Sequence, residues 1–240
     1  MSRPLCIDLF CGLGGWTEGF LAEGWDVIGF DIEQHVYGAH RYPAQLVLQD
    51  VRTLHGSQFR MADMIVASSP CQEFSYRAMP WKRAKALPPP YLGMELFAQA
   101  ARIQAEACEA AGRHIPMIQE NVRGAQKYVG KAAYHFGSFY LWGDVPALMP
   151  TASVEGTKVA GMNWSNFGKP GYKAVALNDP RHGTKNGGDW FGAGDNCSAQ
   201  RRASSKSSAR KFAAARIAKI PAPLARHIAH VYKPEVSYAR

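Results

Sequence analysis

Short apolar runs that end at polar residues or glycine are the feature that most constrains this chain. These runs predict strands at Leu5–Leu9, Val27–Phe30, Leu46–Leu48, Met64–Ala67, Ile115–Ile118 and Phe139–Trp142. Helices are predicted over residues 16–23, before Gly24, and over residues 94–111, before Gly112, because glycine commonly ends a helix. Strands that alternate with helices indicate an α/β fold, with a mostly parallel sheet covered by helices on both faces.

The character of the chain changes after residue 143. Residues 1–143 contain all the predicted strands and form the main domain. Residues 144–200 are dense in Gly, Pro and Asn and lose hydrophobic periodicity, which indicates a small, loop-rich lobe. Residues 201–240 begin with a basic, serine-rich segment and end in a helix that carries Leu224, Ile228 and Val231.

The net charge of +9 favours an acidic partner, of which nucleic acid is the commonest. The five cysteines are odd in number and show no CxxC spacing, which argues against a disulfide framework or a zinc site and predicts no metal. No run of 18 apolar residues is present, so we expect no membrane span. Without a signal-peptide pattern at the N-terminus, we expect a bacterial or host-cell cytoplasmic location.

A glycine-rich turn follows the first predicted strand, in the segment from Asp8 to Gly15. A tight glycine turn between a strand and a helix lets a ligand approach the backbone closely. Asp31 lies 23 residues after Asp8, at the strand end where an acid binds ribose hydroxyls in nucleotide-binding folds. A purely structural turn is the alternative. The segment has no Walker lysine, which disfavours nucleoside triphosphates.

Two further polar segments follow predicted strands. Pro70-Cys71-Gln72 comes after the fourth strand, and Glu120-Asn121-Val122 comes just past the end of the fifth. Open α/β sheets bind ligands along this edge, although a lone cysteine is usually buried and a lone glutamate usually solvated. Residues 74–93 contain several basic residues and no clear periodicity, so we predict a long loop that acts as a lid.

Together these segments resemble the cytosine-C5 DNA methyltransferase family, in particular its compact bacteriophage and prophage members. Residues 8–15 match the cofactor motif, 70–72 the nucleophile motif and 120–122 the acid motif, in the family's order. Gln49-Asp50-Val51 resembles the motif that contacts adenine, and residues 220–224 resemble the last motif, whose helix returns to the cofactor domain. The resemblance implies a Rossmann-like S-adenosylmethionine-dependent fold, with residues 144–200 as a target-recognition lobe.

The resemblance also implies roles for individual residues. Cys71 would be the covalent nucleophile, with Glu120 as the acid and with Pro70 and Asn121 beside them. The residues expected to bind S-adenosylmethionine, and S-adenosylhomocysteine as the product, are Asp8, Phe10, Gly12, Gly14, Asp31, Ile32 and Asp50. Those expected to contact double-stranded DNA are Gln72, Ser75, Arg77, Lys82, Arg83, Lys85 and Arg202. The enzyme would flip its cytosine out of the duplex and act as a monomer.

Two positions depart from the family pattern. The family has an arginine-containing QxRxR segment where this chain has Tyr134 to Ser138, so Arg123 or Lys131 would have to assist Glu120. The last motif has Lys219 where the family has small or amide residues. This lysine would face either the methionine end of the cofactor, where it would favour a carboxylated sulfonium analogue, or solvent and DNA phosphate.

Two other functions are consistent with the same motifs. An RNA cytosine-C5 methyltransferase would keep the chemistry and change the substrate. A catalytically silent nucleic-acid-binding protein would keep the fold alone, but such a protein has no physical need for Cys71 or Glu120. The target DNA sequence is not readable from the chain.

Overall fold

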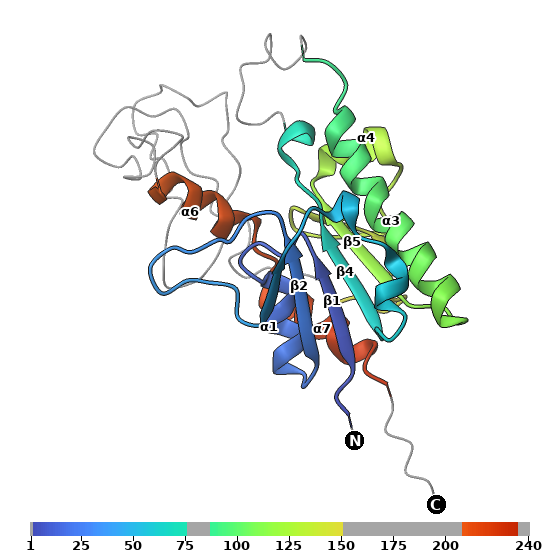
Figure 1. Cartoon of the computed structure of the whole chain (residues 1–240). Coiled ribbons are helices and arrows are strands. Elements are labelled where there is room, and N and C mark those ends of the chain that lie inside the picture. The colour runs from blue at the N-terminus through green and yellow to red at the C-terminus, as the bar shows by residue number, and fades with distance from the viewer. Residues whose placement is uncertain (1, 76–86, 151–207, 235–240) are drawn as a thin grey trace, which may run out of the picture. The chain divides into compact units, whose positions relative to one another are not determined.

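The computed structural model describes residues 2–75, 87–150 and 208–234 of the 240-residue chain. The chain divides into two compact units, of which one comprises Met1–Pro150 and Lys219–Arg240 and the other Thr151–Ala218. The described part of the second unit is the helix α6, Ser208–Ala218, in which Arg216 lies over the Phe212 ring. All other described elements belong to the first unit. Figure 1 draws the described residues of both units in colour.

The first unit is built on a seven-stranded sheet of order β3-β2-β1-β4-β5-β7-β6. Its strands are β1 (Leu5–Leu9), β2 (Asp26–Asp31), β3 (Gln45–Leu48), β4 (Met64–Ser68), β5 (Met117–Asn121), β6 (Tyr134–Phe136) and β7 (Phe139–Gly143). The first five strands pair in parallel, whereas β7 pairs antiparallel with β5 and β6 antiparallel with β7. The strand order reverses between β1 and β4, and open α/β sheets bind ligands at such a switch point.

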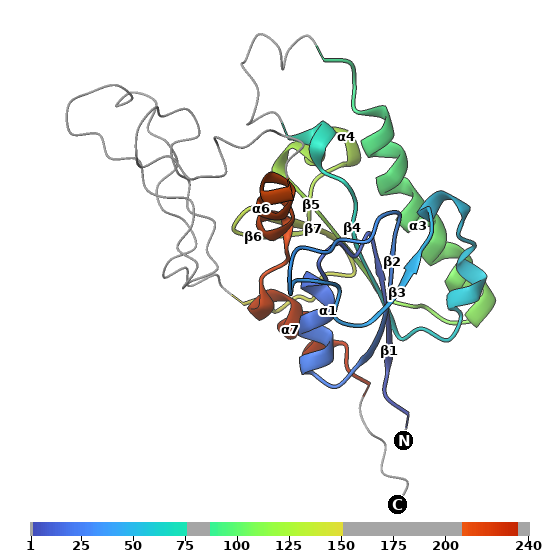
Figure 2. The same cartoon turned by 60° about the vertical axis from the view of Figure 1, so that its left-hand side comes forward.

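Helices cover both faces of this sheet, as Figure 2 shows. One face carries α1 (Gly15–Ala22) and α7 (Ala222–Val231), and the other carries α3 (Tyr91–Ala111). The shorter helices are η1 (Val51–Thr53), η2 (Gly56–Phe59), η3 (Gln72–Phe74), η4 (Arg123–Ala125) and α4 (Gln126–Val129). The central strands are apolar on both sides because both faces are buried, and Ile7, Leu9 and Ile65 of the main core are at most 2% exposed.

The chain's last described helix packs closely on its first. A side chain at Gly19 of α1 would collide with Ala225 of α7, so the small residues let the two backbones approach. Trp25, just after α1, donates an indole N–H hydrogen bond to the Ala229 carbonyl at 3.0 Å. Within the first unit, residues 222–231 therefore pack against α1.

The α/β class and the mostly parallel sheet are confirmed, and several boundaries are corrected. Strand β5 begins at Met117 rather than Ile115, because Pro116 before it has no N–H to donate to a ladder. It also runs through Asn121, so Glu120 and Asn121 lie inside the strand and not past its end. Strand β6 was not predicted.

Two connections also differ from the predicted alternation of strands and helices. The predicted loop over 74–93 is shorter at both ends, because Phe74 belongs to η3 and α3 begins at Tyr91. In these described segments, a loop without an α-helix joins β2 to β3, and the two short helices η1 and η2, again without an α-helix, lie between β3 and β4. In α7, Val231 is 45% exposed, whereas Leu224 and Ile228 are fully buried. The predicted domain limits at residues 143 and 200 stay predictions.

Candidate active site

The glycine-rich turn after β1 is held in an unusual backbone conformation. Phe10 has a φ of 57°, in the left-handed region that a bulky side chain rarely adopts, and Gly12 and Gly14 follow with φ of 52° and 74°. A Cβ on Gly12 would meet no atom within 4 Å, whereas one on Gly14 would lie 2.6 Å from Pro43 Cδ. The backbone at Gly12 therefore borders open space that a ligand can enter, and Gly14 is required by packing.

Asp31 ties the end of β2 to this turn. Its Oδ2 accepts a hydrogen bond from the Gly12 amide at 2.9 Å, and its Oδ1 accepts one from the Glu33 amide at 3.1 Å. The next residue, Ile32, leaves 70% of its surface exposed, which is unusual for a large aliphatic side chain beside a strand end. An acid and an exposed apolar side chain next to the open glycine turn suit a nucleoside.

Asp50 lies at the end of the neighbouring strand β3. Its carboxylate caps η1 by accepting the Arg52 amide at 3.0 Å, and it also pairs with the Arg52 guanidinium at 2.6 Å. These hydrogen bonds from Arg52 hold the pKa of Asp50 below its ordinary value. Asp31 and Asp50 thus follow adjacent parallel strands, which places both acids at one edge of the sheet.

Asp8 is the most unusual charged group in the described part of the chain. It is 1% exposed, and burial raises the pKa of its carboxyl to about 7. Its Oδ2 accepts a hydrogen bond from the Thr17 hydroxyl at 2.6 Å, and Thr17 also bonds the Tyr42 hydroxyl at 2.6 Å. Its Oδ1 is buried without a hydrogen-bond partner. Asp8 was selected from the sequence, but Thr17 and Tyr42 were not. Thr17 could have been found because it lies close to the glycine turn, whereas nothing in the sequence near Tyr42 connects it to Asp8.

The nucleophile segment follows β4 directly. Cys71 is half-buried and is not in a disulfide, and exposed Pro70 joins it to buried Ser69. The fully buried Asn121 of β5 donates from its side-chain nitrogen to the Ser69 carbonyl and to the Ser69 Oγ, both at 3.0 Å. Asn121 therefore fixes the turn that presents Cys71.

Glu120 belongs to the same strand end. It is 8% exposed and lies opposite Ser68 in the parallel pairing of β4 with β5. Cys71 is three residues beyond Ser68, so the topology brings the thiol and the carboxyl to neighbouring strand ends. Trp16, at the start of α1, donates its indole N–H to the Ser68 Oγ at 3.0 Å. This residue, which sequence reasoning missed, links the glycine turn to the nucleophile strand.

Part of the expected DNA surface lies outside the described residues, namely Arg77, Lys82, Arg83, Lys85 and Arg202. Of the others, Gln72 is exposed and Ser75 half-buried. Between them, Glu73 accepts a hydrogen bond from the Gly93 amide at 2.7 Å, which ties the nucleophile segment to the first turn of α3.

The two positions that depart from the family pattern are both described. Lys219 pairs with Glu18 of α1 at 2.5 Å, so its ammonium is engaged within the chain. Tyr134, in the segment that replaces QxRxR, donates its hydroxyl to the Pro150 carbonyl at 2.5 Å. Arg123 and Lys131 are both exposed.

Neither a metal site nor a membrane span emerges from the part of the chain that the structure describes. No group of three or more His, Cys, Asp or Glu side chains there is arranged to hold a metal ion. No described helix is long and apolar enough to cross a membrane.

A family model and a curated relative are similar to this chain. The model of the C-5 cytosine-specific DNA methylases matches residues 5–127, just over half of the chain. A type II methyltransferase, M.XorII of Xanthomonas oryzae pv. oryzae, is 31% identical over 87 residues, which cover 31% of this chain and 20% of that protein. The chain thus spans only a fifth of this curated relative.

Solved structures give weaker likenesses. A prophage-encoded protein of Escherichia coli, described as a DNA modification methyltransferase, is 26% identical with a TM-score of 0.39, over 53% of this chain and 35% of that one. The Entamoeba histolytica methyltransferase EhMeth is 14% identical with a TM-score of 0.35, over 53% of this chain and 40% of that one. On the match of its family model over residues 5–127, the chain belongs to the C-5 cytosine-specific DNA methylase family.

Proposed function

We propose that this protein transfers a methyl group from S-adenosylmethionine to C5 of cytosine in double-stranded DNA. One observation carries the proposal: the ends of the neighbouring strands β1, β4 and β5 present the open glycine turn, Cys71 and Glu120 at one edge of the sheet. The family to which the chain belongs is named for this reaction on DNA. Since all the proposed groups lie on one chain, we propose a monomer that works where cellular DNA is, in the cytoplasm of a bacterial or host cell.

The described residues fit the cofactor. The open face of Gly12 gives it backbone contact, and Asp31 and exposed Ile32 suit the ribose and the adenine ring. In this proposal Asp50, at the end of the neighbouring strand β3, accepts a hydrogen bond from the adenine amine. Asp8 precedes the turn, and its Oδ1 is buried without a hydrogen-bond partner. A positive charge on the methionine part of the cofactor would favour the ionised form of this carboxyl. The cofactor supplies an electrophilic methyl group and leaves as S-adenosylhomocysteine.

The chain's own residues make cytosine reactive. C5 of cytosine is too weak a nucleophile for methyl transfer, so the Cys71 thiolate adds to C6 and turns the ring into an enamine whose C5 is nucleophilic. Glu120 holds the N3 edge and donates a proton or hydrogen bond as negative charge develops there. After C5 gains the methyl group it loses its proton, the C6–S bond breaks and Cys71 leaves as a thiolate.

Asn121 has a different role in this proposal. Its side-chain nitrogen donates to the Ser69 carbonyl and hydroxyl oxygens, and its side-chain oxygen accepts from the backbone amide of Val122 at 2.8 Å. It therefore acts as a positioning residue for Cys71 and does not touch the base. Exposed Gln72 and half-buried Ser75 are proposed to meet the DNA around the flipped nucleotide, together with the basic residues at 77–85 and Arg202.

The test is methyl transfer with radiolabelled S-adenosylmethionine to duplex DNA and, in parallel, to transfer RNA, followed by bisulfite sequencing of the DNA. We expect label in DNA and C5-methylcytosine in the sequence. Label in RNA alone would assign the chemistry to RNA. Absence of label in both, with a correctly folded protein, would contradict the proposed function.

A further inference from the structure

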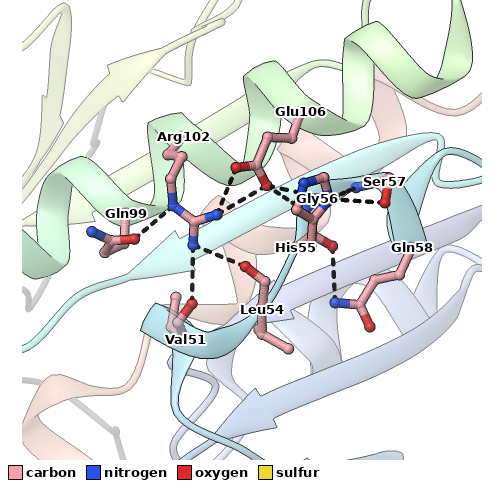
Figure 3. Close-up of polar contacts among 9 residues, drawn as sticks. All are labelled: Val51, Leu54, His55, Gly56, Ser57, Gln58, Gln99, Arg102 and Glu106. Carbon is pink, nitrogen blue, oxygen red and sulfur yellow. Dashed lines mark hydrogen bonds and ion pairs between the residues drawn. The ribbon is translucent and has the colours of Figure 1, made fainter.

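An ion pair on α3 reaches across to the connection between β3 and β4. Arg102 and Glu106 lie one helical turn apart, and their charged groups are joined by hydrogen bonds at 2.7 and 2.9 Å. Figure 3 shows both side chains pointing from the helix toward the backbone of residues 51–58. Because both are only partly exposed, at 33% and 22% of the side chain, this pair is better shielded from solvent than most surface pairs.

The guanidinium of Arg102 binds the backbone on both sides of η1. It donates to the Leu54 carbonyl at 2.9 Å and, more weakly, to the Val51 carbonyl at 3.4 Å (Figure 3). A further N–H donates to the Gln99 side chain at 2.7 Å. With its remaining bonds to Glu106, the planar group is fixed in orientation, so the two carbonyls it binds are held at a fixed spacing.

Glu106 holds the next part of the same segment. Its carboxylate accepts the Gly56 amide at 2.6 Å and lies 3.7 Å from the His55 ring. The Gly56 amide, followed by Arg102, keeps the pKa of Glu106 below its ordinary value, so the carboxylate is charged at neutral pH. A side chain on Gly56 would collide with the Ile103 carbonyl, which shows how closely this turn lies on the helix.

The segment that this pair holds begins with Asp50. Asp50 caps η1, whose first residue, Val51, is 3% exposed. On the other side, the Gln49 amide donates to the Asp31 carbonyl at 2.8 Å. Asp50 is thus located by two anchors, the strand end at Asp31 and the carbonyls that Arg102 binds. Of these, only the second comes from outside the sheet.

We propose that Arg102 and Glu106 are positioning residues for cofactor recognition: from α3 they hold η1 so that the Asp50 carboxylate meets the amine of the adenine ring. This inference rests on the proposed function, in which Asp50 reads adenine. Neither side chain touches the cofactor. Their contribution is therefore to selectivity for the adenine amine, which a merely structural ion pair would not affect.

The test compares two ligands by calorimetry: S-adenosylhomocysteine, and S-inosylhomocysteine, in which a carbonyl oxygen replaces the adenine amine. The wild type should prefer the first by about 10–100-fold, because the analogue offers no donor to Asp50. In Arg102→Met this preference should fall by about tenfold, with most of the loss on S-adenosylhomocysteine. Glu106→Gln, which keeps the shape and an acceptor oxygen, should lower the preference by roughly threefold.

Arg113→Met is the matched control. Arg113 lies two residues beyond the C-terminus of α3, donates to the Ala62 carbonyl at 2.7 Å and lies 3.6 Å from Asp63. It therefore makes the same kinds of contact, but to the chain just before β4 and not to η1. The preference of Arg113→Met for S-adenosylhomocysteine over S-inosylhomocysteine should equal that of the wild type. An unchanged preference in Arg102→Met, or an equal loss in Arg113→Met, would overturn the inference.

Two other outcomes are informative. If Arg102→Met does not fold, Glu106→Gln alone decides, and an unchanged preference there overturns the inference. If the wild type binds neither ligand, the proposed function itself is contradicted. If the wild type binds both with the expected preference and the variants do not change it, only this inference is contradicted.

Discussion

The two halves of the candidate site are built differently. On the cofactor side, Asp31 and Asp50 are satisfied by amides within two residues or by the adjacent glycine turn. On the nucleophile side, the turn before Cys71 is held by Asn121, whose hydrogen bonds to Ser69 span 52 residues of sequence. The cofactor-side carboxylates accept hydrogen bonds that span at most 19 residues of sequence, and Arg102 adds an anchor on the η1 backbone from α3. The nucleophile turn depends instead on the pairing of β4 with β5.

Because of this difference, we expect cofactor binding and the chemical step to be separable by substitution. Substitutions on the cofactor side should change ligand affinity while leaving the chemical step intact at saturating ligand. Substitutions at the ends of β4 and β5 should do the reverse.

Replacement of the nucleophile should have the largest effect. Cys71→Ala removes the only group proposed to add to C6, so methyl transfer should become undetectable. Affinity for S-adenosylmethionine, measured by calorimetry, should stay within about twofold of wild type, since the residue lies off the glycine turn. A large loss of cofactor affinity would show that the two halves are not separable.

Glu120→Gln should slow the chemical step and spare binding. General acid assistance is typically worth about 10²–10⁴-fold in rate, and glutamine fills the same volume without supplying a proton. Single-turnover kinetics at saturating DNA and cofactor provide the measurement. If the single-turnover rate is unchanged, Glu120 takes no part in the reaction.

The buried Asp8 predicts a specific pH dependence of stability. Burial raises the pKa of this carboxyl from 3.8 to about 7 in the folded protein, so folding favours its protonated form. That stabilisation is complete below about pH 4, decreases as the pH rises and is gone above about pH 7. Without cofactor, wild type should therefore lose up to roughly 4 kcal/mol of unfolding free energy relative to Asp8→Asn across this range.

Urea unfolding of both proteins between pH 4 and pH 8 measures this difference. Asn at position 8 keeps an oxygen that accepts from Thr17 but does not titrate, which makes it the matched control. Parallel stability profiles for the two proteins would mean that Asp8 has an ordinary pKa.

Asp31→Ala should show the smallest of these effects, and the effect should be on cofactor affinity and not on the chemical step. Loss of a charged acceptor for the ribose, together with the Gly12 tie, should weaken S-adenosylmethionine binding by about 10–100-fold. Asp31→Asn, which keeps one acceptor oxygen, should lose less. At saturating cofactor the turnover of both variants should approach wild type, and a persistent deficit would break the contrast between the halves.

The parts of the fold that sequence predicts are those in which local chemistry sets the boundary. Strands β2 to β4 are mostly apolar runs that end at or just before a polar residue, β1 leads into a glycine-rich turn, and α3 ends just before Gly112, whose φ of 62° favours glycine. The polar end of β5 was misplaced because Gln119, Glu120 and Asn121 look like a loop. In the sheet, Gln119 is satisfied by the Phe97 carbonyl at 2.9 Å and Asn121 by Ser69, partners that no local pattern reveals.

The candidate site divides in the same way. Its motif residues are visible because each follows an apolar run. The groups that hold them are not, because Tyr42 reaches Thr17 only through the fold of the loop after β2, and Arg102 reaches Leu54 across 48 residues of sequence. The short strand β6 was missed because its three residues, Tyr134–Phe136, have too little periodicity to be recognised.

The central claim is that Cys71 forms a covalent bond to C6 of a cytosine in DNA. DNA that contains 5-fluorocytosine tests it directly, since the fluorine at C5 cannot leave as a proton does and the adduct persists. With S-adenosylmethionine present, we expect a denaturant-resistant protein–DNA complex whose peptide mass maps to Cys71 and which Cys71→Ala does not form. A complex mapped to another residue, or one that Cys71→Ala still forms, would contradict it.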